Sequence, residues 1–282
     1  MEKITVIDLV KKKGREKIVM VTSYDYAFAR LVDKAGVDAI LVGDSVGMVM
    51  HGLKSTLPVS MDDMIHHVKA VAAAKPRALV IGDMPFLSYE ASIEDAIRNA
   101  GLLVKAGAEA VKLEGGVEMV DRVKAIVDAG IPVMGHIGLT PQRYLRFGGY
   151  RRRGRRIEEA EKIIEDAKAL EEAGVFAIVI EFTAAEVAKA ITEEVSVPTI
   201  CIGSGPYCDG QVLVLHDILG LYDEIPSFAK KYVDLSKIVI EAISRYAYEV
   251  RNGLFPSKEH YFTMKEKDRE MFLKKLWKLV KT

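Results

Sequence analysis

Charged side chains stand at the ends of several apolar runs in this 282-residue chain. Asp44 follows "AILVG" at once, and four more such residues come later, namely Asp83, Glu114, His136 and Glu181. Lys112 lies two residues before Glu114, so in an extended strand both side chains point to the same face. Carboxylates that are close together cannot all stay ionised without a compensating cation. The pattern therefore predicts a site that contains a divalent metal ion, a lysine counter-charge, or both.

The residue types narrow the choice of metal. Carboxylate oxygens favour a hard ion, Mg²⁺ first and Mn²⁺ next, whereas zinc prefers clustered His or Cys side chains, which the sequence lacks. Taken singly, an Asp after a strand is more often a helix N-cap, and His136 has the alternative of being an ordinary buried histidine. Only the joint pattern favours a site.

Glu181 lies in the apolar stretch "FAIVIEF". An unpaired glutamate is costly in such surroundings, which favour its neutral form. This is the environment of a general base that works near neutral pH, and we expect Glu181 to be that base.

The elements that must position these residues are eight short apolar runs with helical patterns between them. Continuous Val/Ile/Leu runs indicate strands that are covered on both faces, as in a parallel sheet. The runs are 17–23, 39–43, 78–83, 110–115, 131–136, 176–182, 198–203 and 211–217. Eight such units predict a single-domain (β/α)8 TIM barrel over residues 1–282, with a doubly wound open sheet as the alternative.

The chain ends add helices to this barrel. Residues 1–17 predict a short amphipathic N-terminal helix, and 234–255 and 265–281 predict two C-terminal helices. Apolar residues of the last helix, among them Leu276 and Trp277, need a surface to cover them. We therefore expect a homo-oligomer.

The composition limits the kinds of binding partner that we expect. The formal net charge is zero and hydrophobic residues make up 50% of the chain, so we expect a globular protein without nucleic-acid or membrane partners. No signal peptide is evident, so we expect a cytoplasmic protein, with Cys201 and Cys208 as reduced thiols rather than a disulfide. The basic stretch 150–156 favours a solvated or anion-facing loop, and RNA binding is the non-enzymatic alternative.

Several long stretches resemble the ketopantoate hydroxymethyltransferase family over residues 4–262. They are "TSYDYAFARLVDKAGVDAILVGDSVGMVMHG", "LPVSMDDMIHHVKAV", "IGDMPFLSYE", "AVKLEGG", "MGHIGLTPQ", "FGGYRRRGR" and "CDGQVLVLHDILG". The resemblance implies a Mg²⁺-dependent enzyme that transfers a one-carbon unit from 5,10-methylenetetrahydrofolate to 3-methyl-2-oxobutanoate. The product would be 2-dehydropantoate, on the pathway to pantothenate and coenzyme A, and the assembly a homodecamer.

The same resemblance implies a role for each residue of the pattern. The metal ligands would be Asp44, Asp83 and, directly or through water, Glu114. The substrate contacts would be Asp44, Ser45, Asp83, Lys112 and His136. Glu181 would accept the proton. A related phosphoenolpyruvate/isocitrate-type lyase or mutase is the rival enzyme, but it needs a second anion site, for which only "GSGP" at 203–206 offers a hint.

Overall fold

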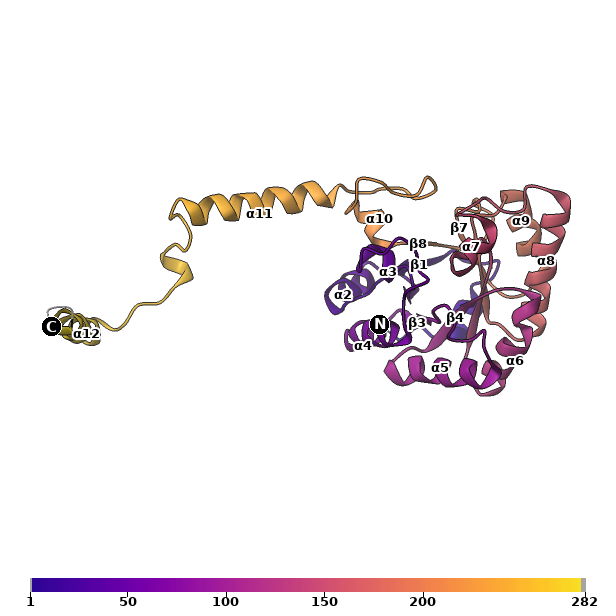
Figure 1. The fold of residues 1–282 in the computed structure, drawn as a ribbon, viewed down its shortest axis with the longest axis horizontal. Coiled ribbons are helices and arrows are strands. Elements are labelled where there is room, and N and C mark those ends of the chain that lie inside the picture. The colour runs from indigo at the N-terminus through magenta and orange to yellow at the C-terminus, as the bar shows by residue number, and fades with distance from the viewer. Residues whose placement is uncertain (1, 280–282) are drawn as a thin grey trace.

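The computed structural model describes residues 2–279, with side chains up to residue 276, and its centre is a closed barrel of eight parallel strands in chain order (Figure 1). The strands are β1 (Ile18–Thr22), β2 (Ala39–Val42), β3 (Leu79–Asp83), β4 (Ala110–Glu114), β5 (Val133–Gly138), β6 (Ala177–Glu181), β7 (Thr199–Ile202) and β8 (Gly210–Leu213). β1 pairs with both β2 and β8, which closes the sheet. The predicted (β/α)8 barrel is confirmed, and the doubly wound alternative is wrong.

Helices fill the crossovers between the strands, except between β7 and β8, where residues 203–209 form no helix. The longer ones around the barrel are α2 (Tyr26–Lys34), α4 (Met61–Ala73), α5 (Ile93–Ala106), α6 (Val120–Asp128), α8 (Ile157–Glu172) and α9 (Ala185–Glu194). Short helices precede or follow the strands, namely α1 (Val6–Lys11), α3 (Val46–Val49), η1 (Val117–Met119), η2 (Pro141–Arg143), α7 (Tyr144–Phe147) and α10 (Leu215–Leu219). Ser60 and Ser92 cap α4 and α5 by accepting backbone N–H bonds from Asp63 and Asp95, as N-cap serines do.

Strand alternation separates two apolar cores. One fills the barrel interior, and the larger one lies between the strands and the helices. On β3, Leu79 and Ile81 face the interior core, and the same period of two places Asp83 on that face at the strand's end. The interior is therefore apolar through most of its depth and charged at one end.

Two predicted strands have limits that differ from the observed ones by more than one residue. The fifth extends to Gly138, two residues beyond its expected end, which places His136 inside a strand. The eighth ends at Leu213 rather than Asp217, and the remaining residues form α10, where the Leu215 N–H donates to Thr22 Oγ1 at 3.0 Å. A continuous apolar run cannot reveal such a switch from strand to helix, because both conformations bury it equally well.

The expectation of two free thiols is wrong. Cys201 in β7 and Cys208 before β8 form a disulfide, with a Cα–Cα distance of 5.7 Å. The expectation rested on the redox state of a compartment, whereas the pairing follows from the neighbouring positions of β7 and β8 in the barrel.

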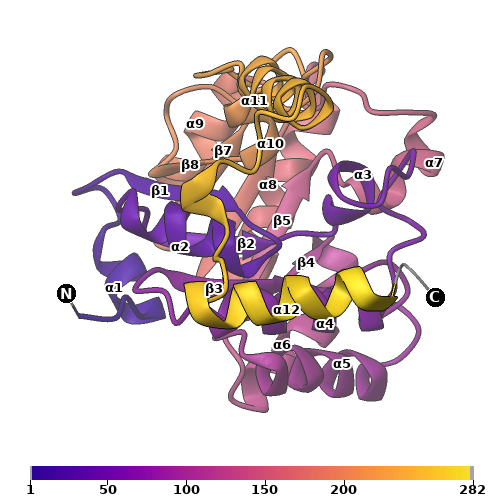
Figure 2. The same cartoon turned by 90° about the vertical axis from the view of Figure 1, so that its left-hand side faces the viewer.

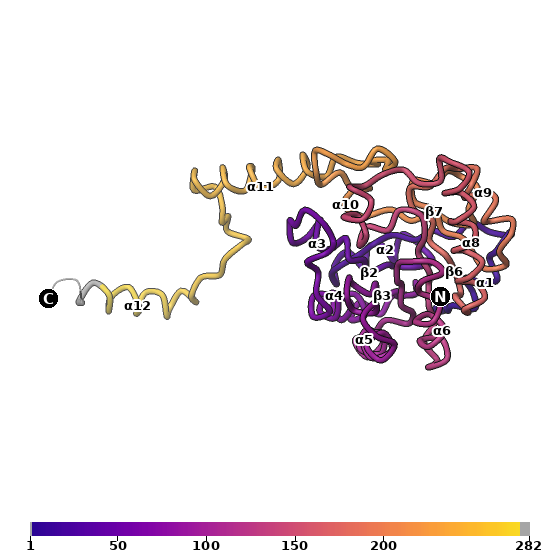
Figure 3. The backbone as a smooth tube through the Cα atoms, turned by 45° about the vertical axis from the view of Figure 1, so that its right-hand side comes forward, coloured from indigo at the N-terminus to yellow at the C-terminus, as the bar shows by residue number. Residues whose placement is uncertain are grey.

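The C-terminal helices form an arm that leaves the barrel. α11 (Leu235–Arg251), η3 (Lys258–His260) and α12 (Glu266–Leu279) extend away from it in Figures 1 and 3. In Figure 2 α11 is seen end-on, and α12 lies lengthwise in front of the barrel. Exposed apolar residues of the arm include Ile238, Ile240, Ile243, Tyr246, Tyr248, Phe262, Met271 and Phe272. The side chain of Trp277 lies outside the described part. None of the described helices is long and apolar enough to span a membrane.

Candidate active site

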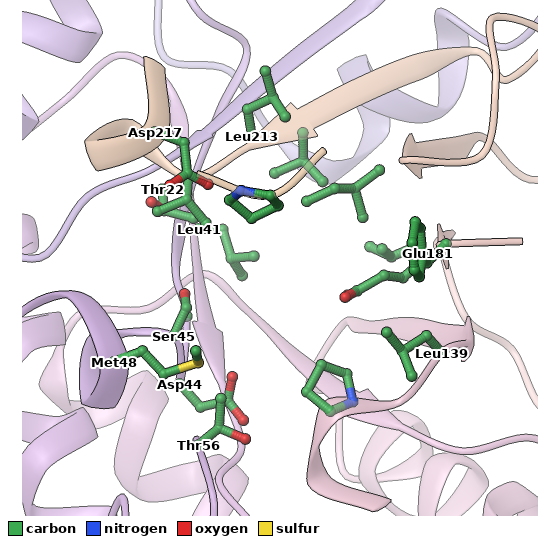
Figure 4. A pocket seen from close by; sticks show the side chains of 18 of the residues that line it. Thr22, Leu41, Asp44, Ser45, Met48, Thr56, Leu139, Glu181, Leu213 and Asp217 are labelled. Carbon is green, nitrogen blue, oxygen red and sulfur yellow. The ribbon is translucent and has the colours of Figure 1, made fainter. Parts of the chain in front are cut away.

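A cavity of about 530 Å³ opens at the carboxyl ends of the strands. Its lining includes every residue singled out from the sequence: Asp44, Ser45, Asp83, Lys112, Glu114, His136 and Glu181. Figure 4 shows Asp44 and Ser45 on one side of the cavity and Glu181 pointing into it from the opposite side. The barrel thus brings together side chains that lie up to 137 positions apart in the chain (44 to 181).

Lys112 and Asp83 form a buried ion pair at the base of this cavity. Lys112 Nζ donates to both Asp83 oxygens, at 2.7 and 2.8 Å. Burial raises the pKa of Asp83 above its ordinary value, although Lys112 opposes this shift. Burial would lower the pKa of Lys112, but the carboxylates of Asp83, Glu114 and Asp44 outweigh it and raise that pKa. Lys112 is therefore a fixed positive charge.

Gln142 joins two of the carboxylates. Its Nε2 donates to Asp44 Oδ2 at 2.9 Å, and its backbone N–H donates to Glu114 Oε2 at 3.0 Å. Gln142 belongs to η2, the short 3₁₀ helix after β5, and its side-chain oxygen accepts a 2.6 Å bond from Tyr89. The backbone N–H of Asp44 in turn donates to Asp83 Oδ2 at 3.1 Å.

His136 lies between two glutamates. Its Nδ1 is 3.4 Å from Glu114 Oε1, and its Nε2 is 3.2 Å from Glu181 Oε2. Burial and Lys112 would lower the pKa of His136, but the two glutamates outweigh them and raise it to about 9. His136 is consequently cationic at neutral pH. Glu181 is not the isolated glutamate that its apolar sequence neighbours suggested, since an imidazolium faces it.

Two backbone features hold Glu181 at the rim. The Leu139 N–H donates to the carbonyl oxygen of Glu181 at 2.8 Å. Gly138, just before Leu139, has a φ of +90°, and a Cβ there would come within 2.5 Å of the same carbonyl oxygen. Phe182, the residue after Glu181, also adopts a left-handed φ of +46°, which is uncommon for a bulky side chain. The chain therefore turns sharply at Glu181.

Ser45 has a partner that the sequence did not indicate. Its Oγ lies 2.9 Å from the hydroxyl of Tyr24, a buried side chain from the loop after β1. Gly43 allows this packing, because a Cβ at that position would be 2.9 Å from Ser45 Oγ. Ser45 is thus oriented toward the cavity by a hydrogen bond.

The donor set fits a magnesium ion held by few protein ligands. Among the described residues, no group of three or more His, Cys, Asp or Glu side chains is arranged to hold a metal ion. Mg²⁺ commonly takes only one or two carboxylates and completes its shell with water and substrate oxygens. Asp44 and Asp83 offer such a pair, linked by the 3.1 Å bond and facing the cavity. Glu114 accepts a bond from the Gln142 N–H through Oε2 and is buried beside His136, so it could support this pair.

Of the basic stretch 150–156, the tyrosine lines the cavity and the arginines do not. Tyr150 lines the cavity, whereas Arg153 pairs with Glu159 and lies over the Phe147 ring at 3.9 Å. Arg151, Arg152, Arg155 and Arg156 are exposed.

The sequence did not indicate that Gln142, Tyr24 and Tyr89 belong to the site. Asp217 fell in the predicted strand 211–217, and no role was predicted for it. The rarity of glutamine was one signal that could have drawn attention to Gln142, because the chain has only two glutamines, Gln142 and Gln211.

Comparison with known proteins identifies the relatives of this chain. The family model of ketopantoate hydroxymethyltransferase matches residues 3–258. The 3-methyl-2-oxobutanoate hydroxymethyltransferase of Staphylothermus marinus is 72% identical over 270 residues, which cover 96% of this chain and 100% of that one. The enzyme of the same name from Ignicoccus hospitalis is 65% identical, over 93% of this chain and all of its own.

Solved structures share the fold at low identity. Phosphonopyruvate hydrolase in complex with oxalate and Mg²⁺ has a TM-score of 0.60 at 14% identity, covering 99% of this chain and 98% of its own. 2,3-Dimethylmalate lyase, a PEP mutase/isocitrate lyase superfamily member, has a TM-score of 0.58 at 18% identity, with 97% and 96% covered. These likenesses show the barrel alone, so the lyase or mutase alternative has support only at the level of the fold. The match over most of the chain and the high identities show that this enzyme belongs to the ketopantoate hydroxymethyltransferase family.

Proposed function

We propose that the chain transfers a one-carbon unit from 5,10-methylenetetrahydrofolate to 3-methyl-2-oxobutanoate in a Mg²⁺-dependent reaction, giving 2-dehydropantoate and tetrahydrofolate. The names of its relatives support the oxo acid as substrate. The main supporting observation is that Glu181 faces Asp44 across one cavity, which Asp83 and Lys112 also line.

The charged cluster would bind the oxo acid. Asp44 and Asp83 would hold Mg²⁺, which as a Lewis acid favours loss of a proton from the carbon beside the keto group. Lys112 places a fixed positive charge next to these carboxylates, and Ser45 offers a hydroxyl to the substrate. These contacts would orient the substrate carboxylate and keto oxygen toward the side of the cavity opposite Glu181.

Glu181 would take the proton from C3 of the oxo acid. His136, cationic and 3.2 Å away, would hold the Glu181 side chain in place. Both C–N bonds to the methylene carbon of the donor would break, with water giving its oxygen to that carbon and its two protons to the folate nitrogens. The enolate carbon would form the new carbon–carbon bond to the same carbon, and the proton taken from C3 would pass to the new hydroxyl oxygen. General-base catalysis of this kind contributes about 10²–10⁴-fold to a rate.

The test isolates the proton transfer from the rest of the reaction. In D₂O with Mg²⁺ and without folate, the wild-type protein should exchange the C3 hydrogen of 3-methyl-2-oxobutanoate for deuterium, as followed by NMR. Glu181→Gln should stop this exchange and lower kcat by about 10²–10⁴-fold, with KM for the oxo acid little changed. Exposed Glu186→Gln or Glu193→Gln in α9 would serve as the matched control. Exchange by Glu181→Gln at the wild-type rate would show that the base lies elsewhere.

We also propose that the protein works as a cytoplasmic homo-oligomer, decameric by resemblance. The exposed apolar residues of the C-terminal arm support an assembly, since soluble monomers rarely expose so large a surface.

A further inference from the structure

One end of the cavity is not used by the residues assigned above. It is formed by the end of β8 and the segment that follows, which contribute Leu213, Val214, Asp217, Tyr222 and Phe228. Figure 4 places Asp217 beside Thr22, away from Glu181. The walls here are mostly apolar and aromatic, and they carry two carboxyls, that of the buried Asp217 and that of the exposed Glu224.

Asp217 is a buried acceptor without a partner in the described residues. The residue is 7% exposed, and no hydrogen bond or ion pair from another described residue reaches its carboxyl. Burial raises the pKa of Asp217 to about 6. At neutral pH the group is therefore mostly ionised, and its oxygens border the cavity with no donor from the described residues, so a bound ligand can supply the donors.

The position of Asp217 is fixed by the barrel. It lies in α10, whose first residue donates its N–H to Thr22 Oγ1 of β1 at 3.0 Å. The helix ends at Gly220, whose left-handed conformation terminates it. The carboxyl is thus presented to the cavity by a short element anchored to the wall.

The volume of the cavity leaves room for a second molecule beside the oxo acid. A cavity of about 530 Å³ is of the size that accommodates a drug-sized ligand, and a five-carbon oxo acid fills only a small part of it. Tyr150, Tyr222 and Phe228 line this space with aromatic faces suited to a flat heterocycle.

We propose that Asp217 anchors the pterin ring of the one-carbon donor, by accepting hydrogen bonds from the 2-amino group and the adjacent ring N–H. This proposal rests on the proposed function, because it presumes a pterin-carrying donor. The two donors lie side by side on the edge of the ring and match the two oxygens of one carboxylate, the geometry of a bidentate charge-assisted pair. Asp217 acts here as a positioning residue for the donor and takes no part in loss of the C3 proton.

The first test separates donor binding from enolisation. Asp217→Asn should raise KM for 5,10-methylenetetrahydrofolate by about 10- to 100-fold, because hydrogen bonds to a charged group are lost. KM for the oxo acid and folate-free deuterium exchange at C3 should stay at wild-type values. Asp223→Asn, which removes an exposed carboxylate six residues further along, is the matched control and should change neither constant.

A second test addresses the contact itself. Binding of tetrahydrofolate and of its analogue without the 2-amino group is measured by calorimetry for the wild type and for Asp217→Ala. Removal of the amino group should weaken binding strongly in the wild type and little in the variant, since both changes delete the same contact. Additive losses would overturn the proposal.

The outcomes distinguish the two proposals. An unchanged donor KM in Asp217→Asn overturns the role of Asp217 while the exchange reaction still supports the proposed function. A loss of exchange in this variant also overturns it, because Asp217 would then act on the oxo acid. Absence of exchange in the wild type would instead contradict the proposed function.

Discussion

Gln142 positions two carboxylates that come from different strands. Because it bonds Asp44 through its side chain and Glu114 through its backbone, Gln142→Leu should leave Asp44 free to move. Loss of such an orienting partner typically costs 10- to 100-fold in metal affinity or activity, and we expect kcat/KM to fall by about that factor. Steady-state kinetics and Mg²⁺ titration would measure the effect.

The control is the other glutamine. Gln211→Leu removes a side chain that is exposed and donates only to the Gly205 carbonyl. Equal kinetics for the two variants would show that Gln142 does not position the carboxylates.

At the scale of single residues, the sequence predicts the charged side chains of the site but not the side chains that hold them in position. Asp83, Lys112, Glu114 and Glu181 were predictable because strand periodicity and a run of apolar neighbours fix where they point. Gln142, Tyr24 and Asp217 lie in loops or short helices after strands, where no periodicity applies. Their positions depend on tertiary contacts such as the Leu215–Thr22 bond, which a single sequence does not display.

At the scale of elements, Asp209 fastens the start of β8 to its surroundings. It accepts bonds from Lys13 Nζ at 2.9 Å, the Gly14 N–H at 3.0 Å and the Thr199 N–H at 2.9 Å. Burial alone would raise the pKa of Asp209, but these bonds outweigh it and hold the pKa below its ordinary value. We predict that Asp209→Asn lowers the free energy of unfolding at pH 7 by about 1–3 kcal/mol.

The pH dependence of that difference follows from the sign of the shift. A lowered pKa in the folded state stabilises the fold at pH values above the unfolded value of about 3.9, and the gain is lost as the pH falls through the folded value. Guanidinium unfolding at pH 7 and near pH 3 should therefore show a smaller difference in acid. Exposed Asp128→Asn should show no such difference, and a pH-independent loss for Asp209→Asn would argue against an ionic cause.

Element prediction succeeded where apolar runs were bounded by glycines or charges. Most strands of the barrel were located in this way within a few residues. It failed at β8, where "VLVL" continues into α10, because hydrophobicity alone does not distinguish a buried strand from a buried helix.

The whole molecule consists of a barrel and an arm that does not cover it. α11 has 17 residues and exposes Ile240 at 64% and Ile243 at 61%. We predict that the full chain sediments as a multiple of its 31.2 kDa mass, and that Ile240→Lys with Ile243→Lys shifts it toward smaller species. Lys237→Glu on the same helix is the control for a change of charge. A monomer for the unaltered chain at micromolar concentration would refute the prediction.

The residues of the arm and the residues that line the cavity also lie in separate stretches of the chain. Every residue that lines the cavity lies between Thr22 and Phe228, whereas α11 begins at Leu235. If the arm forms the interface of the proposed oligomer, changes in the last fifty or so codons alter the assembly without altering the residues that line the cavity. An engineer can graft that segment from one family member to another at the junction near residue 230, and expect the recipient to keep its own catalysis while acquiring the donor's assembly.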